Sequence, residues 1–91
     1  MRSEKELEKE LKQTTKEITK KTNSLKAAEA AHAQAEALFQ AQPTVYNEAG
    51  VVMAHSDIVN LRAELFLLQQ RQDLYTKQLE YIREQAGPIN G

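Results

Sequence analysis

The residues best suited to chemistry in this chain are the glutamates and the histidine around its middle. Glu29 and His32 have the Glu-x-x-His spacing, which places both side chains on one face of a helix, as at carboxylate-bridged two-metal sites in helical bundles. Glu64 is a candidate third ligand from another helix. The motif is short and occurs once, and a histidine that pairs with Glu36 or Glu64 is the simpler interpretation. A metal-binding bundle is therefore an alternative.

A row of lysines is the second candidate site, because such a row can neutralise phosphates. However, Glu8 and Glu17 each stand four residues before another lysine, which is the spacing of ion pairs along a helix. No aromatic residue is interleaved to stack on bases. Nucleic-acid binding is therefore a further alternative. The row consists of Lys5, Lys9, Lys12, Lys16 and Lys20.

No group of residues in the sequence has the spacing of a catalytic site. His55, Ser56 and Asp57 include the three residue types of a catalytic triad, but adjacent residues cannot form that geometry by themselves. The chain has no cysteine, which excludes disulfides, thiolate metal sites and cysteine nucleophiles. It also has no glycine-rich phosphate loop. We therefore expect a protein that is not an enzyme and needs no cofactor.

Two long helices have to position these residues, because apolar residues recur with a seven-residue period in two stretches. Each repeat lays one apolar seam along a helix, and a second helix has to cover that seam. The first seam contains Leu11, Ile18, Leu25, His32 and Phe39. The second contains Ile58, Leu61, Leu65, Leu68, Gln72, Tyr75, Leu79 and Ile82. The sequence predicts an all-α, antiparallel two-helix coiled-coil hairpin that assembles into an oligomeric helical bundle.

Capping and breaking residues predict the bounds of one domain over residues 1–91. Ser3 followed by Glu6 is a typical helix start, and Pro43 ends the first helix. Ser56 is a good cap for the second helix, and Gly87 with the proline after it ends that helix. The predicted parts are a helix over 3–40, a tip over 41–55, a helix over 56–86 and a loose tail over 87–91.

The tip has a mixed pattern that leaves three alternatives. Two short β-branched and aromatic runs flank a polar turn that ends at Gly50, which is typical of a β-hairpin over 44–53. An irregular loop and an early start of the second helix are the other two. Centred between Glu48 and Ala49, this tip would place residue i opposite roughly residue 97 − i, so that His32 faces Leu65.

This register leaves the start of the first helix without a cover. Leu7 and Leu11 would lie at or beyond the end of the second helix, and something outside the hairpin would have to bury them. We therefore expect Leu7, Leu11 and Ile18 to bind a protein partner whose identity the sequence does not give.

A second apolar stripe on the second helix lies away from its seam. A helix that is apolar on two faces is buried on two faces. Burying four of its large side chains at about 1.5–3 kcal/mol each favours a stable homo-oligomer. The alternative is a scatter of ordinary surface residues. The predicted self-association surface is Val59, Phe66, Leu67, Leu74 and Tyr81.

Size and composition agree with a small interaction protein. Ninety-one residues suit one domain, and a lone two-helix hairpin of this length buries little surface, so self-association or a partner is expected. The net charge of −1 gives no overall attraction to nucleic acid or anionic membranes. No apolar run approaches the roughly 18 residues that span a bilayer. We expect a cytoplasmic protein without a membrane partner.

At its tip the chain resembles the β-type subunits of prefoldin, a chaperone built from long helical hairpins. Val45-Tyr46 with Gly50 four residues later carries the resemblance, and Pro43 precedes it. The resemblance implies paired tip strands, and coiled-coil ends that hold non-native protein through Leu7, Leu11 and Ile82. The second helix is shorter than that family usually has. The main expectation is a non-enzymatic coiled-coil adaptor, scaffold or chaperone that acts as a homo-oligomer, with a prefoldin-like holdase as an alternative.

Overall fold

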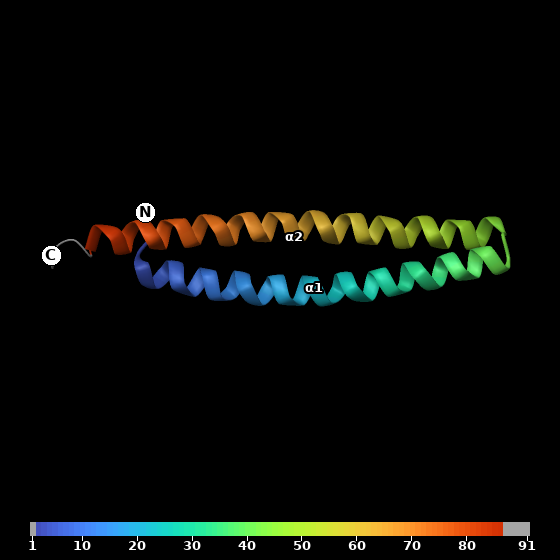
Figure 1. Cartoon of the computed structure of the whole chain (residues 1–91), viewed down its shortest axis with the longest axis horizontal. Helices are drawn as coiled ribbons and strands as arrows, with labels where there is room; N and C mark the ends of the chain where they lie inside the picture. The colour runs from blue at the N-terminus through green and yellow to red at the C-terminus, as the bar shows by residue number, and fades with distance from the viewer. Residues whose placement is uncertain (1, 87–91) are drawn as a thin grey trace.

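The chain folds into a single helical hairpin. The computed structural model describes residues 2–86. Helix α1 (Glu4–Ala41) and helix α2 (Val45–Ala86) lie antiparallel and side by side, and the end of α2 extends past the start of α1 (Figure 1). The rod measures 70 × 18 × 16 Å, and its two described ends lie together at the end away from the turn. The predicted all-α hairpin is confirmed, while the tail over 87–91 lies outside the described residues.

Helix α1 begins where the capping signal predicts. The Oγ atom of Ser3 accepts a hydrogen bond of 3.2 Å from the backbone N–H of Glu6. Glu4 and Glu6 place negative charge at the positive end of the helix dipole. The helix ends at Ala41, two residues before Pro43, because a proline restricts the residue before it to extended backbone.

The turn between the helices is much shorter than predicted. Only residues 42–44 lie outside the two helices there. The Oγ1 atom of Thr44 accepts a hydrogen bond from the N–H of Asn47 (3.1 Å), so Thr44, and not Ser56, caps α2. The carbonyl of Gln42 accepts two hydrogen bonds of 2.8 Å, one from the Nδ2 atom of Asn47 and one from the backbone N–H of Thr44. The predicted tip over 41–55 is therefore wrong, as is the predicted start of the second helix at residue 56.

Residues 45–53 are helical, and no β-hairpin forms over them. Of the three alternatives for the tip, the early start of the second helix is therefore the correct one. A helix here satisfies its own backbone hydrogen bonds and packs against α1, whereas an isolated two-stranded hairpin is marginally stable. Gly50 has no positive φ and lies inside the helix. Its conformational freedom is not used.

The short turn also changes the pairing of the two helices. Thr15 bonds to Gln72, and the ring of His32 lies 5.9 Å from that of His55. These contacts place residue i beside roughly residue 87 − i, ten residues from the predicted register. His32 therefore lies beside His55 and not Leu65. The cause is the position of the turn, which centres on Pro43 and not between Glu48 and Ala49.

The two predicted seams form the contact between the helices. All the seam positions of α1 are partly buried, and the seam positions of α2 are buried or partly buried. Leu7 is fully buried and packs with Tyr75 and Leu79, while Leu11 and Ile82 pack against this cluster. The expectation that Leu7 and Leu11 are uncovered is therefore wrong, because the observed register brings α2 over them.

Candidate protein-interaction surface

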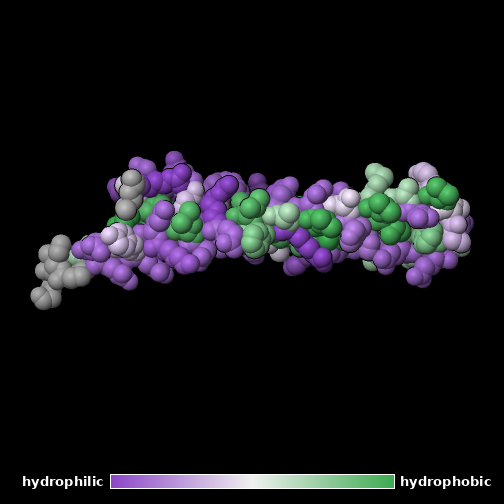
Figure 2. Space-filling view, turned by 90° about the horizontal axis from the view of Figure 1, so that it is seen from above, coloured by the Kyte–Doolittle hydropathy of each residue, from purple (hydrophilic) through white to green (hydrophobic). Residues whose placement is uncertain are grey.

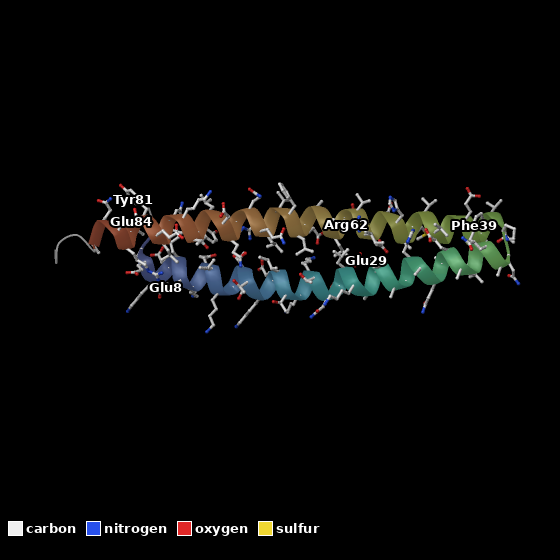
Figure 3. The ribbon with its side chains drawn as sticks, viewed as in Figure 1. Glu8, Glu29, Phe39, Arg62, Tyr81 and Glu84 are labelled. Carbon is white, nitrogen blue, oxygen red and sulfur yellow. The ribbon has the colours of Figure 1, made fainter. Side chains whose placement is uncertain are left out.

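Ion pairs close both edges of the seam and use the charged residues that flank it. The guanidinium of Arg83 donates to the carboxylates of Glu4 (3.0 Å) and Glu8 (3.2 Å), and these bonds raise its pKa. Figure 3 shows Glu29 and Arg62 in the space between the helices. All these side chains are partly exposed to water, which weakens such pairs, so they align the helices and contribute little to stability. The other pairs between the helices are Arg62–Glu29, Arg71–Glu17 and Lys21–Glu64.

These pairs change the interpretation of the lysine row. Glu8 and Glu17 were expected to neutralise Lys12 and Lys21, but both carboxylates point to arginines of α2 instead. The five lysines of the row are exposed, and none forms an ion pair within residues 2–86. The outer side of α1 away from the turn is therefore a basic, hydrated face without aromatic residues.

The candidate metal ligands have separate partners. Glu29 pairs with Arg62, and Glu64 pairs with Lys21. The Nε2 atom of His32 lies 3.4 Å from a carboxylate oxygen of Glu36, as the simpler interpretation predicts. Across the described part of the chain, no three acidic, histidine or cysteine side chains are placed to hold a metal ion.

The three residues of triad type do not converge. His55 lies beside the ring of His32, while Ser56 and Asp57 are exposed along α2. Successive side chains point about 100° apart around a helix, so these neighbours diverge. Their arrangement offers no proton relay.

The predicted self-association residues lie together on the outer side of α2. Val59, Phe66, Leu67, Leu74 and Tyr81 are each 50–64% exposed. They stand one and two positions after seam residues, which places them on the opposite side of the helix from α1. Figure 3 shows Tyr81 on this outer side. The five residues are exposed together, and their role in self-association stays a prediction.

The same stripe continues as far as the turn. The sequence-based prediction did not include this part of it. Val45 and Tyr46 are 84% and 85% exposed, and Val52 and Met53 are also exposed. Figure 2 looks onto the outer side of α2 and shows apolar side chains gathered toward the turn and along the middle of the rod. The signal was available, because these four residues precede the predicted ones at seven-residue intervals. We call the nine exposed apolar residues from Val45 to Tyr81 the outer stripe.

The outer stripe consists of two columns with a third column between them, each with a seven-residue step. The first column is Val45, Val52, Val59 and Phe66, followed by Asp73 and Glu80. The second is Tyr46, Met53, Asn60, Leu67, Leu74 and Tyr81. The central column is small near the turn, at Ala49, Ser56 and Ala63, and then becomes Gln70 and Lys77. The stripe is therefore most apolar and flattest over residues 45–67.

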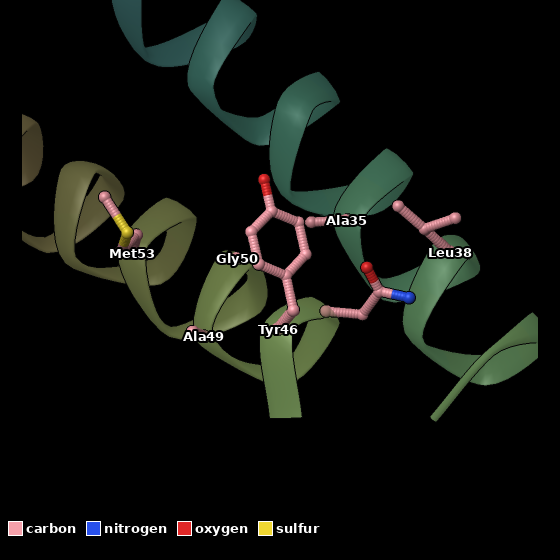
Figure 4. A pocket seen from close by; sticks show the side chains of 7 residues that line it. Ala35, Leu38, Tyr46, Ala49, Gly50 and Met53 are labelled. Carbon is pink, nitrogen blue, oxygen red and sulfur yellow. The ribbon is translucent and has the colours of Figure 1, made fainter. Parts of the chain in front are cut away.

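A shallow hollow of about 200 Å³ lies at the edge of the stripe near the turn. In Figure 4 the ring of Tyr46 extends past Gly50 toward Ala35 of α1, with Leu38 and Met53 on either side. Pockets for small ligands are usually about 300–1,000 Å³ and enclosed. This open hollow matches a single apolar side chain of a protein partner better than a small molecule.

Comparison with known proteins adds no further constraint. No protein-family model, curated protein or solved structure matches the chain. Val45, Tyr46 and Gly50, which carry the resemblance to prefoldin subunits, all lie in the first turns of α2. Neither of the two helices, over the residues described, is long and apolar enough to cross a bilayer.

Proposed function

We propose that this protein is a coiled-coil interaction module that associates with itself through the outer stripe of α2. The observation that supports the proposal is the nine large apolar side chains, each at least half exposed, on the side of α2 that α1 leaves free. Single apolar residues are common on protein surfaces, but a contiguous stripe with a seven-residue step is typical of a helix that packs against another helix. The proposed role is binding through apolar contact and uses no catalytic side chain.

The free energy gained by burying the stripe indicates how much of the stripe a partner has to cover for association to be stable. Completing the burial of a half-exposed large apolar side chain contributes about 1 kcal/mol. Nine such residues on each of two copies contribute roughly 18 kcal/mol, against an estimated cost of about 4–15 kcal/mol for bringing two molecules together. A contact that uses half of the stripe or less would therefore be weak. We expect association to engage most of its length.

The first prediction concerns the mass of the protein in solution. We expect light scattering to give at least a dimer for the wild type and a monomer for Phe66→Glu, because the new carboxylate would have to be buried without a partner. The matched control is Ala30→Glu, which adds the same charge to the exposed outer side of α1 and should leave the mass unchanged. Circular dichroism of each variant should show unchanged helicity. A monomeric, fully helical wild type would contradict the proposal.

A holdase function is the second candidate, and the apolar residues at the turn favour it. Val45 and Tyr46 are the most exposed large apolar residues of the described chain, and the hollow beside Tyr46 fits an apolar side chain. Such a surface can hold the apolar segments of a non-native protein. The test is suppression of aggregation of a denatured reporter protein by the wild type and by a Val45→Asp, Tyr46→Asp double variant. Equal suppression by both, or none by the wild type, would contradict this candidate.

A further inference from the structure

We propose that two copies of this chain pair through their outer stripes in antiparallel orientation, with the two-fold axis between Val59 and Asn60. The inference rests on the proposed self-association and specifies its geometry. In an antiparallel pair related by a two-fold axis, each column of the stripe lies beside the same column of the partner. The register is therefore decided by which residues of a column meet.

With this axis, the apolar residues of the second column face apolar residues of the partner, and one polar residue faces the same residue of the partner. Tyr46 meets the partner's Leu74, and Met53 meets the partner's Leu67. Asn60 meets the partner's Asn60, and two facing side-chain amides can each donate to and accept from the other. A self-paired asparagine of this kind is a known device for fixing the register of helix pairs.

The first and central columns agree with the same axis. Val52 meets the partner's Phe66, and Val59 meets the partner's Val59. Ser56 meets the partner's Ala63, so small side chains lie at the centre and the two helices can approach closely. Asp73 reaches the start of the partner's α2 at Val45, where the helix dipole favours a carboxylate.

Moving the axis by half a heptad in either direction gives a worse match. With Ser56 on the axis, Asn60 faces the partner's Met53 and Leu74 reaches past the partner's turn. With Ala63 on the axis, Asp73 lies against the partner's Val52, two turns inside the partner's helix. A carboxylate held there loses water and gains neither a hydrogen bond nor the helix dipole, which is costly.

A parallel pair is also disfavoured by charge. It would place Lys77 against the partner's Lys77 in the central column, and Asp73 and Glu80 beside the partner's Leu74 and Tyr81. Like charges in contact oppose association, and charged groups against apolar ones are desolvated. The antiparallel pair leaves Lys77 and Glu80 near or beyond the partner's turn, in water.

The proposed pair covers enough surface for a stable dimer. Seven large apolar residues of each copy, from Tyr46 to Leu74, face apolar partners in this register, and each is at least half exposed in the hairpin. At roughly 100 Å² of exposed surface each, they supply about 700 Å² per copy, close to the roughly 800 Å² of a standard protein interface. Helices that overlap over about 30 residues would make this contact.

Cysteine cross-linking tests the register, because the chain has no cysteine of its own. Ser56→Cys and Ala63→Cys introduce single thiols at exposed, small positions of the central column. Each variant alone should give few disulfide-linked dimers. An equimolar mixture should give several-fold more, all of them mixed dimers, because only Ser56 and the partner's Ala63 lie within disulfide reach. Ala30→Cys, on the outer side of α1, is the control and should not cross-link above background.

Every other outcome overturns the proposed register. Cross-linking of Ser56→Cys alone places the axis at Ser56, cross-linking of Ala63→Cys alone places it at Ala63, and cross-linking of both alone indicates a parallel pair. A dimer by light scattering that gives no disulfide in any of these samples uses another surface. A monomer by light scattering contradicts the proposed function itself, so the two failures are distinguishable. Small-angle X-ray scattering should give a maximum length of about 90 Å, against about 70 Å for a parallel pair.

Discussion

Asn47 holds the two helices together at the turn. Its side-chain amide donates to the carbonyl of Gln42, which also accepts the N–H of Thr44, and its own N–H is capped by Thr44. Replacing Asn47 by alanine removes the first bond, while the carbonyl of Gln42 keeps the N–H of Thr44 as a donor (2.8 Å). We predict that Asn47→Ala lowers the free energy of unfolding by about 1 kcal/mol, measured by urea denaturation.

The control for this substitution is Gln40→Ala, which changes an exposed side chain near the end of α1 that makes no hydrogen bond within residues 2–86. It should change the free energy of unfolding by less than about 0.5 kcal/mol. If Asn47→Ala has an equally small effect, the turn is not held by this side chain.

Gly50 offers the opposite test. The glycine is helical, and a Cβ built on it meets no atom within 4 Å. Alanine has a higher helix propensity because its backbone loses less entropy on folding. We predict that Gly50→Ala raises the free energy of unfolding by about 0.5–1 kcal/mol in urea denaturation, while Ala27→Gly on α1 lowers it by a similar amount. A loss of stability in Gly50→Ala would indicate that the glycine adopts another conformation in solution.

The cap at Thr44 could not be identified from residue types alone. Ser56 followed by Asp57 is at least as good a start signal as Thr44 followed by Val45, and Gly50 suggested a turn. The deciding information is the heptad repeat, which continues without a slip from Ile58 back to Asn47 through Ala54 and Val51. Small and polar members hide this part of the repeat, so hydrophobicity alone does not show it.

At the scale of the helices, Leu7 is the residue whose role depends most on the register. It is fully buried against Tyr75 and Leu79. We predict that Leu7→Ala lowers the free energy of unfolding by about 2–5 kcal/mol, because it leaves a cavity in the buried cluster that Leu7 forms with Tyr75 and Leu79. The measurement is urea denaturation at matched protein concentration.

Leu38→Ala provides the comparison, because Leu38 is half exposed at the edge of the hollow near the turn. Its loss should cost less than about 1.5 kcal/mol. Equal costs for the two substitutions would mean that α2 does not cover Leu7 and that the observed pairing is wrong.

The seams could be predicted from the sequence but their pairing could not. Seven-residue spacing identifies which side of each helix faces the other, and every predicted seam residue lies there. The pairing depends on where the chain turns, and an error of five residues in that position moves every partner by ten. This single error produced both the wrong neighbour for His32 and the wrong exposure of Leu7. The seven-residue spacing within each helix identifies its buried side and does not by itself give the position of the turn.

At the scale of the whole molecule, apolar and charged surfaces are separated. The basic face lies on the outer side of α1 away from the turn, and the outer stripe lies on α2 and is densest near the turn. We predict that self-association does not weaken when salt rises from about 0.05 to about 0.5 M, because apolar contact drives it and salt screens only exposed charges. Sedimentation equilibrium at several concentrations measures the dissociation constant. A tenfold weakening would indicate an interface held by charge.

The start of α1 at Glu4 and the end of α2 at Ala86 lie at the same end of the rod. A mechanical load applied across them would peel the helices apart one layer after another, as a zipper opens, and would not shear all the layers together. The cluster of Leu7, Tyr75 and Leu79 would resist first, and the Thr15–Gln72 layer behind it would yield with less force.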